Sequence, residues 1–162
     1  MQVKRPLVVD VETTIFQKGN PFAKRNKLCW IGCYPEGGSF LVGSPDFLPV
    51  IEREIIHSSE VVGFNLKFDL HWLRRAGLDI SNIRVWDCQL AHFLLTSQRV
   101  KYPSLDEVLE YYGLPPKDDV VKRDYWEANP PIDTPDIPQE VIINYLCIDL
   151  MRTMQVYQKQ RE

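Results

Sequence analysis

Residues 6–13 read Pro-Leu-Val-Val-Asp-Val-Glu-Thr, an apolar, valine-rich run with two acids near its end. A run of this kind bounded by proline predicts a buried strand. Because alternate residues of a strand point to one face, the Asp10 and Glu12 carboxylates are expected side by side. Taken alone, the pair is most simply explained as two solvated acids at a strand edge. If the strand is buried, a hard divalent cation offsets their repulsion better than a protein group does.

Outward from this strand, the chain alternates between strand-like and helix-like stretches. Further strands are expected at residues 27–34, 39–42, 60–64 and 83–87. Helices are expected at residues 46–57, 65–76, 89–95 and 105–112, the last opened by a capping box, and from Asp136 towards the C-terminus. A hairpin followed by alternating strands and helices indicates one α/β domain, a mixed five-stranded sheet with helices on both faces. Residues 114–138, rich in proline and charge, predict an irregular excursion over the surface.

Composition excludes several classes of protein. The chain has 19 basic and 22 acidic residues, a net charge of −3, whereas proteins that coat nucleic acids by electrostatics alone are strongly basic. No apolar run approaches the ~20 residues of a membrane helix, and residues 1–6 lack the apolar stretch of a signal peptide. The four cysteines lack zinc-site spacing and are expected as reduced thiols. A cytoplasmic protein without membrane contact is the default expectation.

A third acid, Asp69, ends the stretch Gly-Phe-Asn-Leu-Lys-Phe-Asp at residues 63–69. It falls in the first turns of an expected helix, where the helix dipole stabilises negative charge. That stabilisation alone explains an acid here. The apolar neighbours Phe68 and Leu70, and the loop before the helix, equally suit a carboxylate that faces a cleft beyond the strand ends.

The C-terminal helix carries Tyr145 and Asp149, which are four residues apart and therefore share a face. A tyrosine in such a place is more often a core residue with its hydroxyl at the edge. Asp149 is flanked by Ile148, Leu150 and Met151, and an acid in so apolar a stretch requires a partner.

Together these elements resemble the three motifs of the DEDD superfamily of 3′→5′ exonucleases, whose fold is similar to that of ribonuclease H. Asp10-Val-Glu12 resembles the first motif, residues 65–69 the second, and Tyr145 with Asp149 the third. The histidine branch has a histidine five residues before the last Asp. This chain has Asn144 there and Tyr145 next to it, so it resembles the tyrosine branch. Within that branch it is most similar to the proofreading domain of family A DNA polymerases, including phage ones, over residues 6 to about 155.

The resemblance implies an active site in which Asp10, Glu12, Asp69 and Asp149 hold two Mg²⁺ or Mn²⁺ ions. Asp10 would bridge both ions, Glu12 and Asp149 would complete the first, and Asp69 would hold the second through water. Tyr145 would orient the attacking water, and the products would be nucleoside 5′-monophosphates. The implied substrate is the 3′ end of single-stranded DNA. The implied setting is replication or repair in a bacterial or phage-infected cell, with a DNA polymerase as partner.

Other residues are expected to contact the substrate near these motifs. They are Thr13, Thr14, Phe16, Phe64 and Asn65. The Phe16 ring suits stacking on a terminal base, although an ordinary loop anchor explains it equally well. Basic residues of the first loop suit phosphate contacts but are more often simply solvated. Asp87 is expected to cap the following helix rather than to bind metal.

Two alternatives stay open at the level of sequence. One is an RNA 3′-end trimming exonuclease of the ribonuclease D type, with the same chemistry and contacts to the 2′-hydroxyl. The other is a catalytically silent exonuclease-like module that binds a partner or a DNA end. The presence of all five motif residues, the four acids and Tyr145, argues against the silent module, because binding alone gives no reason to hold four like charges together. Added metal should stabilise an active two-metal site and not an inert module.

Overall fold

The strands form one mixed sheet with β1 at its centre. The computed structural model describes residues 3–99 and 101–162, so Met1, Gln2 and Val100 lie outside the described residues. The strands are β1 (Leu7–Thr13), β2 (Leu28–Pro35), β3 (Leu41–Gly43), β4 (Val61–Gly63) and β5 (Val85–Asp87). Their order is β3-β2-β1-β4-β5. β1 pairs antiparallel with β2 and parallel with β4, which confirms the predicted mixed five-stranded sheet.

Five α-helices in the described part of the chain accompany the sheet. They are α1 (Leu48–His57), α2 (Leu66–Arg75), α3 (Cys88–Leu95), α4 (Leu105–Tyr111) and α5 (Gln139–Arg161). The predicted capping box is present at the start of α4. The predicted start of the last helix near Asp136 is wrong. Pro138 holds the preceding Ile137 in an extended conformation, so α5 begins only at Gln139. Within residues 3–99 and 101–162, none of the helices has the length and apolar character that a membrane crossing requires.

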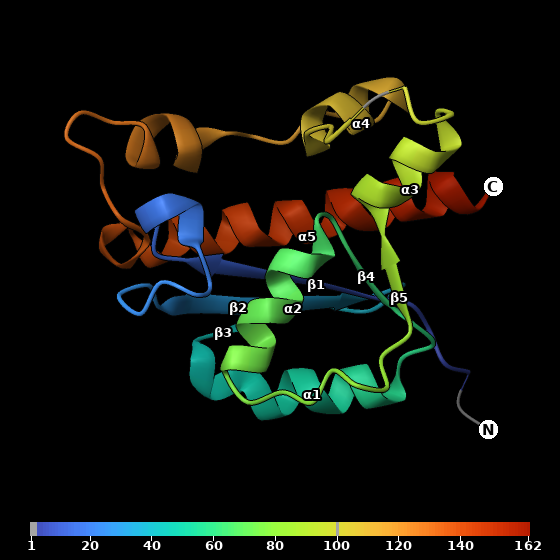
Figure 1. Cartoon of the computed structure of the whole chain (residues 1–162), viewed down its shortest axis with the longest axis horizontal. Helices are drawn as coiled ribbons and strands as arrows, with labels where there is room; N and C mark the ends of the chain where they lie inside the picture. Colours follow the sequence, from blue (N-terminus) through green and yellow to red (C-terminus); the bar gives the residue numbers. More distant parts are fainter. Residues whose placement is uncertain (1–2, 100) are drawn as a thin grey trace.

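Helices cover both faces of the sheet, as predicted (Figure 1). On one face, α2 packs against β1 and α1 packs against β2, in one core with the odd-numbered residues 7–11 of β1. On the other face, α5 runs along the sheet and packs against Val8. Because residues of a strand alternate between faces, Asp10 and Glu12 share the face of Val8. The alternation therefore aims both carboxylates at α5.

Residues 114–138 pass over α5 (Figure 1). Their backbone is irregular as predicted, apart from a π-helical turn at Lys122–Trp126 and a 3₁₀ turn at Thr134–Asp136. Most of its side chains are exposed or partly exposed, but Val121 and Ile137 are buried in a small core with Tyr145 of α5. In the sequence, proline and charged residues outnumber the few apolar residues that anchor the segment, so these anchors are not apparent. The segment is therefore part of the packed domain and lies close to the candidate site.

Candidate active site

Three carboxylates from β1 and α5 converge on one point. Asp10 and Glu12 project from β1, and Asp149 projects from the facing side of α5. One oxygen from each lies within 4.8 Å of the other two, a spacing that suits a shared cation. The predicted grouping of these three acids is therefore present in the structure.

Asp69 joins the cluster through a shared backbone N–H group. It lies in the first turn of α2, next to the carboxyl end of β4, which runs parallel to β1. The Val11 N–H donates at 3.0 Å both to Asp10 Oδ1 and to Asp69 Oδ1. Asn65, the residue before α2, has a left-handed backbone (φ 55°) that turns the chain directly from the strand into the helix. The tight turn places Asp69 beside Asp10.

Burial raises the pKa of all four carboxyls. It raises the pKa of Asp10 to about 6, against the lowering effects of a hydrogen bond with Asp69 and of the Lys117 ammonium. It raises the pKa of Asp149 to about 7, again against Lys117. The pKa values of Glu12 and Asp69 lie well above the usual range, first through burial and then through the charge of Asp10. Four acids so close together, two buried and two partly buried, need added positive charge to ionise together at neutral pH.

The donor set fits a hard divalent cation. Carboxylate oxygens are the ligands that Mg²⁺ and Mn²⁺ prefer, and the cluster offers four such groups within a small space. Asp149 Oδ1 is buried and accepts no hydrogen bond from any described residue. The Lys117 ammonium lies 3.5 Å from this oxygen, which therefore already faces a positive charge. Asp10, Glu12 and Asp149 would hold one ion, and Asp69 beside Asp10 would contribute to a second.

Tyr145 is held from two sides next to the acids. Its side chain is buried, and its ring meets the Trp126 ring edge-to-face with centroids 5.6 Å apart. Its hydroxyl accepts a hydrogen bond from Lys117 Nζ at 3.3 Å. Burial, and then the charges of Asp149 and Glu12, raise the pKa of the phenol above its ordinary value. The hydroxyl therefore stays protonated and acts as a hydrogen-bonding group rather than as a base.

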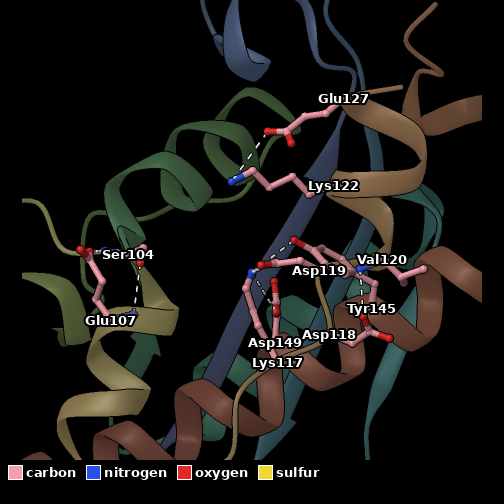
Figure 2. Close-up of polar contacts among 10 residues, drawn as sticks. All are labelled: Ser104, Glu107, Lys117, Asp118, Asp119, Val120, Lys122, Glu127, Tyr145 and Asp149. Carbon is pink, nitrogen blue, oxygen red and sulfur yellow. Dashed lines mark hydrogen bonds and ion pairs between the residues drawn. The ribbon is translucent and has the colours of Figure 1, made fainter. Parts of the chain in front are cut away.

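Lys117 is a site residue that the sequence analysis missed. It lies in the 114–138 segment, and its side chain, 13% exposed, forms ion pairs with Asp149 and Asp119 (Figure 2). Burial alone would lower the pKa of the ammonium, but the charges of Asp149 and Asp119, followed by weaker ones, raise it instead. No local pattern marks this lysine, because its position depends on how the irregular segment folds over α5.

The residues expected to bind substrate separate into two places. Phe64 and Asn65 line a cavity of about 430 Å³ together with Asp10, Lys117 and Asp149. Tyr102, Pro103 and Ser104 line the same cavity, at the loop before α4, and were not expected there. The structure therefore places the β4–α2 turn at the mouth of the acid cluster.

Thr13 and Thr14 line a smaller cavity of about 240 Å³ beside Glu12. Both threonines are buried, and their hydroxyl groups bond within the protein, to Thr14 O and to Asn26 Oδ1 respectively. Phe16 lines neither cavity, and the Arg25 guanidinium covers its ring at 4.0 Å. Contact of these three residues with substrate stays a prediction.

Asp87 caps two helices at once. Its carboxylate accepts hydrogen bonds from Gln89 N (2.9 Å) and Leu90 N (3.5 Å), which confirms the predicted cap of α3. It also accepts from Asn65 N (3.0 Å) and Leu66 N (2.9 Å) at the start of α2. Asp87 therefore fixes the helix that carries Asp69 and is not itself one of the clustered acids.

The fold and the acid cluster define an α/β domain of the ribonuclease H type whose acids suit divalent cations. The model of the family described as 3′-5′ exonuclease matches residues 1–160, and the chain belongs to this family. Family membership confirms the resemblance drawn from the three motifs. Among the curated proteins, none matches the chain.

Solved structures share the fold at low sequence identity. The apo form of a nuclease matches 97% of this chain and 72% of its own, with a TM-score of 0.69 and 14% identity. The family B DNA polymerase of the hyperthermophilic archaeon Pyrobaculum calidifontis matches 98% of this chain and 24% of its own, with a TM-score of 0.65 and 16% identity. Brucella melitensis NrnC matches 98% of this chain and 72% of its own, with a TM-score of 0.62 and 16% identity. These likenesses confirm the ribonuclease H-like fold.

Proposed function

We propose that this chain is a metal-dependent 3′-5′ exodeoxyribonuclease that removes nucleotides from the 3′ end of single-stranded DNA as nucleoside 5′-monophosphates. The observation that carries the proposal is the convergence of Asp10, Glu12 and Asp149 on one point, with Asp69 of α2 beside Asp10. Membership of the 3′-5′ exonuclease family supports the polarity and the reaction. The setting we propose is proofreading or end trimming in DNA replication or repair, with a DNA polymerase as partner.

The four acids are proposed to hold two Mg²⁺ or Mn²⁺ ions. Two bound cations clamp the attacking and leaving oxygens of an in-line displacement at phosphorus and make water a better nucleophile. Asp10 groups with Glu12 and Asp149 and also shares the Val11 N–H with Asp69, so it is the acid placed to serve both ions. The structure of Brucella melitensis NrnC with bound Mg²⁺ supports the choice of ion.

Tyr145 is proposed to orient the attacking water, as in the tyrosine branch of the superfamily. Its hydroxyl accepts a hydrogen bond from Lys117, so its own proton is free to donate to another acceptor. The phenol stays neutral because burial raises its pKa. Tyr145 therefore positions a reacting group without taking up a proton.

Substrate binding is proposed to use both cavities beside the acids. Phe64 and Asn65 line the larger cavity, where they would contact the terminal nucleotide and its neighbour. Thr13 and Thr14 line the smaller one, where they would pack against the substrate, because both hydroxyls, both carbonyl groups and the Thr14 N–H already bond within the protein. Phe16, partly exposed beside this region, would stack on a base if the Arg25 side chain moves aside.

Removal of nucleotides from RNA 3′ ends is the second candidate. Brucella melitensis NrnC has the same fold as this chain and was solved bound to pGG. The chemistry at the acids would be the same for RNA, and the difference would lie in contacts to the 2′-hydroxyl.

One digestion experiment tests polarity, sugar and strandedness together. Single-stranded DNA, duplex DNA and RNA of one sequence, each labelled at the 5′ end, are incubated with Mg²⁺, Mn²⁺ or EDTA. We expect a ladder of progressively shortened labelled strands from single-stranded DNA with either metal and none with EDTA. Faster shortening of RNA would select the second candidate. Immediate release of labelled mononucleotide would show 5′-end attack and contradict both.

A further inference from the structure

The Lys117 ammonium occupies the position of a cation inside the acid cluster. Its Nζ lies 3.5 Å from Asp149 Oδ1, 3.3 Å from Tyr145 Oη and 3.7 Å from Asp119 Oδ1 (Figure 2). It also lines the cavity that contains Asp10 and Asp149. Lysine is rarely buried unless it is paired, so a specific set of partners accounts for this burial.

Lys117 is also alone in this role among the residues that the structure describes. Of the ion pairs within residues 3–99 and 101–162, only the Lys117–Asp149 pair includes one of the four clustered acids. One positive charge therefore faces four carboxyl groups. It offsets part of their repulsion and leaves a net negative site, which still attracts divalent cations.

The hydrogen bond from Lys117 fixes the direction of the Tyr145 hydroxyl. An ammonium group has only donors, so Tyr145 Oη must be the acceptor of this bond. The phenolic proton then points away from Lys117. The Trp126 ring holds the Tyr145 ring from another side. The Tyr145 hydroxyl is therefore free to donate its own proton to a group bound beside the acids.

We propose that Lys117 is a resident cation of the active site, which weakens the binding of divalent metal at Asp10, Glu12 and Asp149 while it positions Tyr145 for the reaction. The inference rests on the proposed function. Removal of Lys117 should therefore strengthen the binding of divalent metal and slow the reaction. Loss of the ammonium charge removes a repulsion felt by an incoming cation, whereas loss of the hydrogen bond releases the Tyr145 hydroxyl. A residue that only supports the fold would not strengthen metal binding when it is removed.

The chain offers a matched control for this charge. Lys122 lies in the same segment and pairs with Glu127 at 3.8 Å, but both side chains are more than half exposed (Figure 2). Lys122→Met changes the net charge as Lys117→Met does, at a place outside the cavity. Lys117→Gln is a third variant that removes the charge and keeps an N–H donor. It carries the test if Lys117→Met does not fold.

The experiment measures Mn²⁺ affinity by calorimetry and single-turnover cleavage of single-stranded DNA for the wild-type chain and the three variants. We expect Lys117→Met to bind Mn²⁺ about tenfold more tightly, because a unit charge beside the ion is removed, and to cleave roughly 10- to 100-fold more slowly at saturating metal. Lys117→Gln should bind Mn²⁺ as tightly as Lys117→Met and lose less of the cleavage rate. Lys122→Met should match the wild type in both measurements.

Unchanged or weaker Mn²⁺ affinity in folded Lys117→Met or Lys117→Gln would overturn the inference, and so would cleavage at the wild-type rate. These outcomes differ from failure of the proposed function. A wild-type chain that binds Mn²⁺ but shortens no nucleic acid would contradict the proposed function alone, because the effect of Lys117 on metal affinity is measured without substrate.

Discussion

Strand β1 and the 114–138 segment both reach Asp149 and Tyr145 of α5, but they do so by different means. β1 is a regular strand at the centre of the sheet, and its alternation aims Asp10 and Glu12 at α5. The segment is irregular, and it supplies a cation, Lys117, and an aromatic ring, Trp126. The four clustered acids thus come from regular elements, whereas the cation that faces them comes from an irregular segment.

The two regions are joined by a short chain of hydrogen bonds. The Thr134 hydroxyl donates to the backbone oxygen of Thr13, and it accepts from the Trp126 indole N–H at 3.1 Å. Asp133 Oδ1 accepts from Ile15 N at 3.0 Å, just beyond β1. The end of β1 therefore holds the segment in the place from which Lys117 and Trp126 reach Tyr145.

The largest expected effect comes from breaking the β1 side of the site. Asp10→Ala should lower the rate of DNA cleavage by on the order of 10³-fold or more, because it removes the acid placed to serve both ions. The fold should persist, since loss of one buried acid relieves repulsion among the rest. Cleavage is measured on 5′-labelled single-stranded DNA, and unfolding by circular dichroism. Glu52→Ala, at an exposed acid of α1, is the control. A folded Asp10→Ala chain that trims 3′ ends at the normal rate would rule out the site.

A smaller loss is expected where the two regions meet. Tyr145→Phe removes the hydroxyl that Lys117 holds but keeps the ring against Trp126. Cleavage should slow by roughly 10- to 100-fold, since the acids remain and only orientation is lost. Mn²⁺ affinity should stay near that of the wild type, as measured by calorimetry. A loss as complete as that of Asp10→Ala would mean that Tyr145 does more than orient water.

The raised pKa values of the acids predict a metal-dependent response to pH. Asp10 and Asp149 have folded-state pKa values of about 6 and about 7, above the ordinary value of 3.8. Their contribution to stability is therefore complete below pH 3.8 and is lost as pH rises through 6 to 7. In EDTA, the melting temperature should fall by roughly 5 °C between pH 5 and pH 8 through these groups.

Saturating Mn²⁺ should restore most of this loss at pH 8 and have little effect at pH 5, because only ionised carboxylates bind the ion. Differential scanning fluorimetry between pH 5 and pH 8, with EDTA and with Mn²⁺, measures both melting temperatures. Equal stabilisation by Mn²⁺ at pH 5 and pH 8 would contradict the assignment of the ion to these acids. An Asp10→Ala chain should lose most of the Mn²⁺ response at pH 8.

The smallest expected effect comes from removing a hydrogen bond between the 114–138 segment and the end of β1. Thr134→Val removes the buried hydroxyl that links Trp126 to Thr13. The free energy of unfolding should fall by about 1 kcal/mol, which lowers the melting temperature by roughly 3 °C. Cleavage should slow only slightly. Thr96→Val, whose hydroxyl bonds only to carbonyl groups of its own helix, is the control. If both substitutions lower the free energy of unfolding equally, the hydrogen bonds of Thr134 to Trp126 and Thr13 contribute no more than those of another hydroxyl.

The same contrast explains what the sequence predicted and what it did not. Asp10, Glu12, Asp69 and Asp149 were predicted because strand alternation, helix periodicity and family motifs each act over a few neighbouring residues. Lys117 was missed because its position depends on the packing of Val121 and Ile137 against α5, which is a long-range property. Similarly, the capping pattern predicts a start of α5 near Asp136, but the extended conformation that Pro138 imposes on Ile137 delays the start to Gln139.

The double cap made by Asp87 has a consequence for where the chain tolerates insertions. A single carboxylate receives the N–H groups of Asn65 and Leu66 from one helix start and of Gln89 and Leu90 from another. Added residues at either junction would pull one helix off the shared oxygens and shift Asp69 with it. Length variation among functional sequences of this fold should therefore fall in the loop between β1 and β2 or in the 114–138 segment, and not where β4 enters α2 or β5 enters α3.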